Sequence, residues 1–297
     1  MAVDFEKTAV KVSLVSIFGN IILSLLKLAA GIVAGSGAMI SDAVHSASDV
    51  FSSIIVIVGV RLSAKTSDKE HPYGHERMEC VAAIILAVVL LVTGIFIADS
   101  TIGALISGEA AKAEIPGIIA LVAAIVSIIS KEAMFWYTRY YAKKLDSGAV
   151  MADAWHHRSD ALSSVGALIG IAGARMGFKV LEPIASLVIC VFIFKAAYDI
   201  FKDAVDKMVD HSCDDGTEQE LRECAASCEG VRGVDLLHTR IFGNKIYVDI
   251  EIRADGEKTL TEGHEIAEKV HTEIEKKFPK VKHIMVHVNP DRTVVEE

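Results

Sequence analysis

The chain has 297 residues, of which 52% are hydrophobic, and its mean hydropathy is +0.42. This composition is too apolar for an ordinary soluble domain of this length, so the chain is expected to contain a membrane domain. The net charge of −9 comes without a basic run, which argues against a nucleic-acid-binding protein.

Apolar residues concentrate before about residue 205, in six segments that each approach the roughly 20 residues needed to cross a bilayer. The predicted spans cover residues 10–33, 38–60, 80–106, 115–137, 149–174 and 180–201. The second and fifth spans also carry carboxylates and histidines, which a span tolerates where they face the interior of a helix bundle. We therefore predict a six-helix transmembrane domain over residues 1–208, with no cleavable signal peptide.

Basic residues are enriched in the loop between the second and third spans and in the loop between the fourth and fifth. They are Arg61, Lys65, Lys69 and Arg77 in the first of these loops, and Arg139, Lys143 and Lys144 in the other. Short loops rich in lysine and arginine face the cytoplasm. Six spans then place both termini in the cytoplasm, and the predicted location is the cell membrane.

Residues 209–297 have the composition of a charged, soluble domain. Helices are expected at 215–228 and 261–277, and strands at 234–242, 245–253 and 281–289. Within 245–253, apolar and polar side chains alternate, as they do in a sheet with one buried face. The order α-β-β-α-β predicts a small cytoplasmic α+β domain of the ferredoxin-like kind.

Two copies of one pattern lie inside the weak spans: His45-x-x-x-Asp49 and His156-x-x-x-Asp160. Residues i and i+4 of a helix share a face, about 6 Å apart along the axis. Two such helices facing each other supply two nitrogens and two oxygens, a tetrahedral set for a divalent metal. The pattern predicts a metal transport site, and a proton relay without metal is the alternative.

His156 is preferred over its neighbour His157 as the ligand, because only His156 precedes Asp160 by four residues. Consecutive helical residues point about 100° apart, so the two imidazoles cannot share a site face. Asp42 and Asp153 each precede a paired histidine by three residues. Each could orient that imidazole, or simply pack or cap a helix.

A second constellation, Asp68-x-x-His71-x-x-x-His75, lies in the loop after the second span. Pro72 and Gly74 form a turn that could bring the three side chains together, so a loop metal site is a candidate. In the soluble domain, Asp249 and His287 lie on the polar faces of two strands.

His264 begins the helix between those strands and completes a third, weaker candidate set with Asp249 and His287. Five cysteines, an odd number, do not indicate a disulfide framework. Cys224 and Cys228 share a helix face, where either metal binding or plain packing would explain them.

Taken together, the chain resembles the cation diffusion facilitator family over essentially its whole length. The resemblance is carried by Ser41-Asp42-Ala43-Val44-His45, by Ala152-Asp153-Ala154-Trp155-His156, and by His71-Pro72-Tyr73-Gly74-His75-Glu76-Arg77-Met78-Glu79. It implies a homodimeric exporter that exchanges cytoplasmic divalent metal for H⁺, with no prosthetic group. It maps the transport site onto His45, Asp49, His156 and Asp160, and the loop site onto Asp68, His71 and His75.

The same resemblance maps cytoplasmic sites onto Asp249, His264 and His287. Asn289 stands where some members have an acid, and Asp249 where some have a histidine, so a binuclear cytoplasmic site is in doubt. It also implies that Arg77 and Asp206 form a basic–acidic pair that locks the dimer, with ordinary interfacial charges as the alternative.

Histidine at the first position of the second-span pair is similar to zinc-preferring members, so Zn²⁺ is the expected cargo. Iron, cobalt, cadmium and manganese stay open. A membrane metalloenzyme is the competing class, but the His-Glu-x-x-His pattern of zinc proteases is absent from the sequence. A metal sensor is the third, with cytoplasmic metal drawing two soluble domains together.

Overall fold

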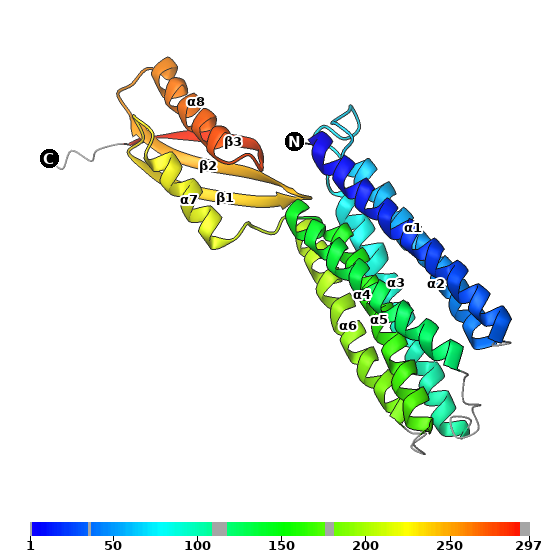
Figure 1. Ribbon diagram of the computed structural model, residues 1–297. Helices are drawn as coiled ribbons and strands as arrows, with labels where there is room; N and C mark the ends of the chain where they lie inside the picture. The colour runs from blue at the N-terminus through cyan, green and yellow to red at the C-terminus, as the bar shows by residue number, and fades with distance from the viewer. Residues whose placement is uncertain (1, 35–36, 109–117, 176–180, 292–297) are drawn as a thin grey trace. The chain divides into compact units, whose positions relative to one another are not determined.

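The computed structural model describes residues 2–34, 37–108, 118–175 and 181–291 (Figure 1). The chain divides into two compact units, Met1–Val205 and Asp206–Glu297. The predicted boundary, after residue 208, lies three residues beyond this division.

Six long helices make up the described part of the first unit. They are α1 (Ala2–Ala34), α2 (Gly37–Ser63), α3 (Met78–Ser107), α4 (Ile118–Leu145), α5 (Gly148–Arg175) and α6 (Leu181–Met208), whose last residues belong to the second unit. Each helix overlaps one predicted span. Among the described residues, two stretches are long and apolar enough to cross a membrane by length and composition, Phe5–Ala30 and Met78–Ser107.

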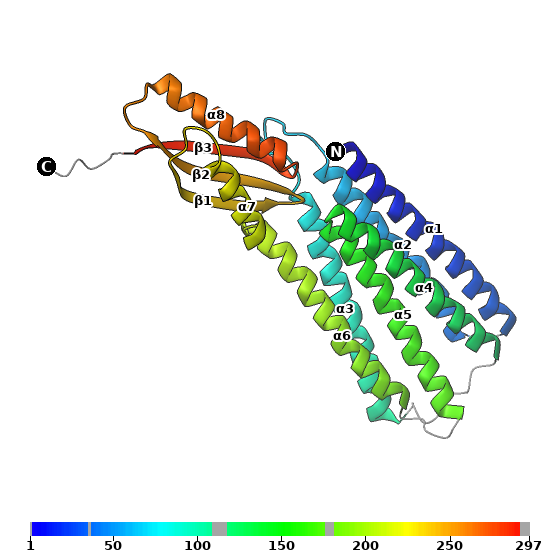
Figure 2. The same ribbon diagram turned by 60° about the vertical axis from the view of Figure 1, so that its left-hand side comes forward.

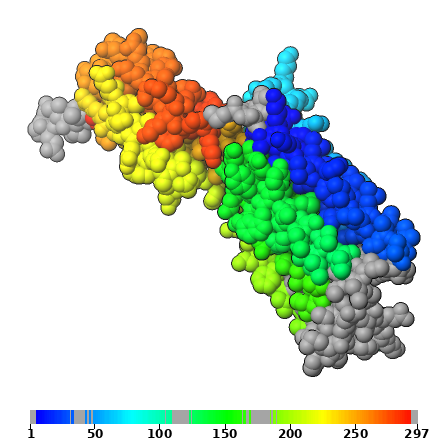
Figure 3. Space-filling model, viewed as in Figure 1, coloured from blue at the N-terminus to red at the C-terminus, as the bar shows by residue number. Residues whose placement is uncertain are grey.

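Helix α5 is central to this unit, because it packs against α2, α3 and α4. Helix α1 runs beside α2 and also beside α4, as the blue and green surfaces in Figure 3 show. Where α2 crosses α3, a Cβ added to Gly59 would lie 2.3 Å from the Cβ of Ala82, so only glycine permits this approach. Large apolar side chains point outward from the helices, including Phe18, Phe96 and Phe192.

The second unit contains α7 (Asp215–Ala226), β1 (Gly233–Phe242), β2 (Lys245–Asp255), α8 (Leu260–Lys277) and β3 (Val281–Asp291). Strand order is β1-β2-β3, with β1 antiparallel to β2 and β3 parallel to it. The α-β-β-α-β order is the predicted one. Helix α8 begins at Leu260 because Thr259 and Glu262 form a reciprocal capping box there.

Both helices of this unit cover the same face of the sheet (Figures 1 and 2). The core joins three central strand residues to residues of both helices: Val248, Ile250 and Ile252 from β2, Leu221 and Ala225 from α7, and Ile266, Val270 and Ile274 from α8. Each large apolar side chain buried in this way contributes about 1.5–3 kcal/mol. The other face of the sheet carries the alternate residues, among them Asp249 and His287, which are exposed.

Candidate metal centre

Asp49, His156 and Asp160 converge inside the first unit. One ligand atom from each lies within 4.8 Å of the others, and all three side chains are buried. The Nε2 atom of His156 is 3.5 Å from Asp49 Oδ1 and 3.9 Å from Asp160 Oδ2. These separations are close to the edge, about 3.4 Å, of a tetrahedron with metal–ligand bonds of about 2.1 Å.

The chemistry of this group also fits a divalent cation. Neither ring nitrogen of His156 has a hydrogen-bond partner in the described part of the chain, although the ring is buried. A buried polar atom without a partner is costly, and a metal ion held with the two carboxylates would satisfy it. Asp49 comes from α2 and the other two from α5, so the group requires the packing of these two helices.

The predicted fourth ligand, His45, lies in α2 four residues before Asp49. Its side chain, like that of Asp42, falls outside the described residues, so its ligand role stays a prediction. The helical spacing places its backbone one turn from Asp49, as the sequence pattern requires.

Lys131 of α4 is also part of this site, although no sequence motif had marked it. Its Nζ atom donates to Asp49 Oδ2 at 2.5 Å, to Asp160 Oδ2 at 2.9 Å and to Asn20 Oδ1 at 2.9 Å. The side chain is 1% exposed. Its position inside a predicted span could have indicated this role. A lysine within a membrane span pairs with an opposite charge or with backbone carbonyls.

His157 and Asp153 belong to a different polar group beside the site. His157 Nε2 lies 3.1 Å from Ser16 Oγ, and 3.7 Å from Asp153 Oδ2. Asp153 accepts a hydrogen bond from Ser53 Oγ at 3.2 Å. Asp153 therefore lies beside His157, the residue four positions later in α5. It does not cap this helix, which begins five residues earlier at Gly148.

The loop between α2 and α3 brings Asp68, His71 and His75 together, again with ligand atoms within 4.8 Å. The Asp68 carboxylate lies 3.4 Å from His71 Nδ1 and 3.5 Å from His75 Nε2. The turn depends on Gly74, whose φ of 99° favours glycine, and whose N–H donates to the His71 carbonyl. The three predicted residues thus meet in a compact loop group.

The Asp68 carboxyl of this loop is held in its ionised form by its hydrogen-bond donors. Lys65 Nζ donates to Asp68 Oδ2 at 2.7 Å, and the N–H of His71 donates to Oδ1 at 2.8 Å. The Lys65 hydrogen bond first, and then that backbone N–H, hold the pKa of the Asp68 carboxyl well below its usual range. The carboxylate is therefore ionised, which is the form that binds metal.

Asp249, His264 and His287 do not form one group within a single chain. Asp249 pairs in register with Met285 and Glu251 with His287, so both candidate residues lie on the open face of the sheet. His264 belongs to α8, which covers the opposite face, and its Nε2 lies 3.8 Å from Glu268. Asn289 donates to Glu251 at 3.1 Å on the open face.

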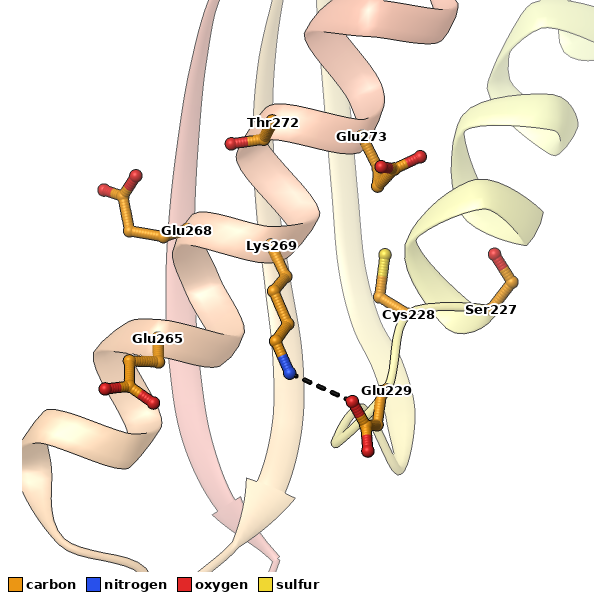
Figure 4. Close-up of a pocket in the computed structure, with 8 residues that line it drawn as sticks. All are labelled: Ser227, Cys228, Glu229, Glu265, Glu268, Lys269, Thr272 and Glu273. Carbon is orange, nitrogen blue, oxygen red and sulfur yellow. Dashed lines mark hydrogen bonds and ion pairs between the residues drawn. The ribbon is translucent and has the colours of Figure 1, made fainter.

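Cys224 and Cys228 lie where α7 ends. Cys224 is buried in the core. The thiol of Cys228 donates to the backbone carbonyl of Cys224 at 3.4 Å. Cys228 borders a hollow (Figure 4). Its acidic lining is Glu265, Glu268 and Glu273 from α8, together with Glu229 from the loop after α7. Burial raises the pKa of the Cys228 thiol, which disfavours the thiolate that metals bind.

The predicted dimer pair, Arg77 and Asp206, falls on the two different units. Arg77 immediately precedes α3, and Asp206 lies near the end of α6. Their pairing stays a prediction.

A helical unit that buries a carboxylate–imidazole group among its helices, followed by a small αββαβ unit, defines a membrane protein that handles divalent cations. The chain belongs to the cation efflux, or cation diffusion facilitator, family. Residues 13–209 match the model of the cation efflux transmembrane domain. Residues 213–291 match that of the cation efflux protein cytoplasmic domain.

Curated relatives agree with this assignment. The manganese efflux system protein MneP of Bacillus subtilis (strain 168) is 31% identical over 98% of this chain and 99% of its own length. Metal tolerance protein C1 of Arabidopsis thaliana is 34% identical over 94% of this chain, which spans 62% of that protein. The magnetosome protein MamB of Magnetospira sp. (strain QH-2) is 30% identical over 93% of each chain. The chain is therefore a membrane transporter for the efflux of divalent metal cations.

Proposed function

We propose that the chain is a secondary-active antiporter that exports cytoplasmic Zn²⁺ in exchange for H⁺. The observation that carries the proposal is the buried group of Asp49, His156 and Asp160. Ionisable side chains buried in a membrane-spanning bundle are costly, and two carboxylates beside an imidazole without a hydrogen bond form a donor set that suits a cation in transit. His45 would complete the tetrahedron.

Proton exchange follows from the chemistry of these ligands. A metal binds neutral imidazole and ionised carboxylate, so loading the site releases protons and protonating it expels the metal. Imidazole changes charge between pH 5 and 8, where a cellular proton gradient acts. One site alternately open to each side would then couple the two gradients.

Zinc is proposed because two imidazoles and two carboxylates make the four-coordinate set that Zn²⁺ prefers. Manganese is the alternative that the name of the relative MneP favours. Iron, cobalt and cadmium would fit the same donors.

The remaining parts of the proposal concern entry, assembly and orientation. The loop group of Asp68, His71 and His75 would bind metal near the cytoplasmic end of α2. The protein would act as a homodimer with both termini in the cytoplasm, locked by Arg77 and Asp206. Asp249 and His287 would bind metal at a cytoplasmic surface where two copies meet, since the open sheet face leaves them exposed.

Transport by the purified chain in proteoliposomes tests the proposal. Vesicles with an imposed pH gradient are offered Zn²⁺, Mn²⁺, Fe²⁺, Co²⁺ and Cd²⁺ in turn, and metal uptake and internal pH are followed together. Zinc uptake accompanied by opposite proton movement is expected. Uptake that is indifferent to the pH gradient would reject the antiport mechanism, and a preference for Mn²⁺ would reject the assigned cargo.

Asp160→Ala and Asp49→Ala should each abolish this uptake. The matched control is Asp99→Asn, which removes a carboxylate from the exposed surface of α3 and should leave uptake unchanged. Survival of uptake in either site variant would show that the transport site lies elsewhere.

A further inference from the structure

Lys131 places a positive charge on the two carboxylates of the proposed transport site. An ammonium group has three N–H donors. In this site the three are used by Asp49, Asp160 and Asn20, at distances of 2.5, 2.9 and 2.9 Å. The amine is therefore fully coordinated by oxygen, as a small bound cation would be.

The lysine and a metal ion would compete for the same atom. Asp160 Oδ2 is the oxygen that accepts from Lys131, and it is also the one facing His156 Nε2 at 3.9 Å. A zinc ion about 2 Å from each of these two atoms would bridge that gap. Since Lys131 Nζ is 2.9 Å from Asp160 Oδ2, metal and ammonium would lie within about 5 Å of each other.

Charge balance opposes the presence of both cations. The two carboxylates and one ammonium carry one net negative charge, and a divalent ion bound to both carboxylates would neutralise them. The Lys131 side chain is 1% exposed. Its ammonium would then be a buried positive charge beside a metal ion, with both carboxylates of the site already bound to the metal. An uncompensated buried charge is strongly disfavoured.

We propose that Lys131 is a tethered counter-cation of the empty transport site, and that a divalent metal ion loads by displacing its ammonium from Asp49 and Asp160. The inference rests on the proposed transport site. On loading, the side chain turns toward α1, where Asn20 offers a neutral acceptor. On release, the ammonium returns to the carboxylates and helps to expel the metal.

A tethered competitor weakens the apparent affinity for metal, because only molecules whose carboxylates are free can bind. The apparent dissociation constant equals the intrinsic one divided by the competent fraction. If the ammonium holds the site in about nine molecules of ten, its removal tightens binding about tenfold. A lysine with a purely structural role would give the opposite result, since its loss would weaken binding.

Calorimetric titration of the full-length chain with Zn²⁺ tests this inference. Asp160→Asn first identifies the component of the binding curve that belongs to the transport site. Lys131→Met should then tighten that component by about tenfold or more, while Lys131→Arg, which keeps the charge, should not. Glu132→Gln is the control, because its carboxylate lies on the same helix and contacts Arg158 at 3.6 Å.

The outcomes distinguish failure of the transport site from failure of the displacement. If Asp160→Asn removes no binding component, the transport site itself is misassigned. If it does remove one, but Lys131→Met leaves that component unchanged or weaker, only the displacement fails.

A metal-bound structure of the unmodified chain gives a second measurement, which does not depend on whether a variant folds. It should show metal on Asp49 and Asp160 with Lys131 Nζ moved away from both. Metal on both carboxylates with the amine still bonded to them would overturn the inference.

Discussion

Loss of the Lys131 amine should destabilise the metal-free protein, and added metal should reverse the effect. In Lys131→Met the carboxylates of Asp49 and Asp160, 2% and 7% exposed, are left buried without this cation. Breaking a buried ion pair by removing one partner costs about 3–5 kcal/mol. For a unit of this size the loss corresponds to a decrease of about 10 °C in the melting temperature.

Tryptophan fluorescence can follow the unfolding of this unit selectively. The sequence contains two tryptophans, Trp136 and Trp155, and they lie in α4 and α5. Thermal unfolding in detergent micelles would be recorded with chelator and with Zn²⁺. A metal present at a thousand times its dissociation constant stabilises the folded state by about 4 kcal/mol. Saturating Zn²⁺ should therefore restore most of the stability lost in Lys131→Met.

Two further variants sharpen the comparison. Glu132→Gln breaks a half-exposed pair with Arg158, which is worth only about 0–1 kcal/mol. Asp49→Asn combined with Lys131→Met removes one of the stranded carboxylates and should recover part of the loss. Equal destabilisation by Lys131→Met and Glu132→Gln, with no added effect of metal, would refute the charge balance assigned to the site.

His156→Ala should abolish metal binding at the transport site. His157→Ala should lower thermal stability and leave the binding constant nearly unchanged. Similar losses of metal binding in both variants would contradict the choice of His156 as the ligand. The raised pKa of the Cys228 thiol keeps its neutral form to higher pH, so alkylation at pH 8 should be slower than for a free thiol, and Zn²⁺ should not protect it. Protection by Zn²⁺ would instead indicate a metal ligand. Gly59→Ala forces α2 away from Ala82 and should cost about 1–3 kcal/mol in thermal unfolding, whereas an unchanged melting curve would mean that the helices separate freely.

Local patterns predicted the secondary structure closely, because apolar length marks the long helices of the first unit and side-chain periodicity marks the elements of the second. The alternation in 245–253 specifies a strand with one buried face, and β2 buries Val248, Ile250 and Ile252 on that face. The ends of elements were less accurate. Helix α7 ends at Ala226, two residues before the predicted end, whereas every long helix of the first unit ends beyond the predicted end of its apolar segment.

Which candidate ligands lie close together was predictable where their spacing in the chain is short or where one pattern is repeated on two helices. The loop group spans only Asp68 to His75, and the structure brings its members together. Lys131 is 82 residues from Asp49 and 29 from Asp160, so no local spacing connects them. Strand register is also invisible in a single sequence, which is why the pairing of Asp249 with Met285 could not be predicted.

The sheet of the second unit is poorly suited to strand addition at either edge of its described three strands. A register irregularity between Val234 and Leu236 interrupts the ladder of β1. Strand β3 carries Pro290, which has no N–H to donate, and an exposed Lys282. Interruptions, prolines and lysines at edges oppose the growth of continuous sheets between molecules. Copies crowded on one membrane can therefore meet through the faces of these units without polymerising edge to edge.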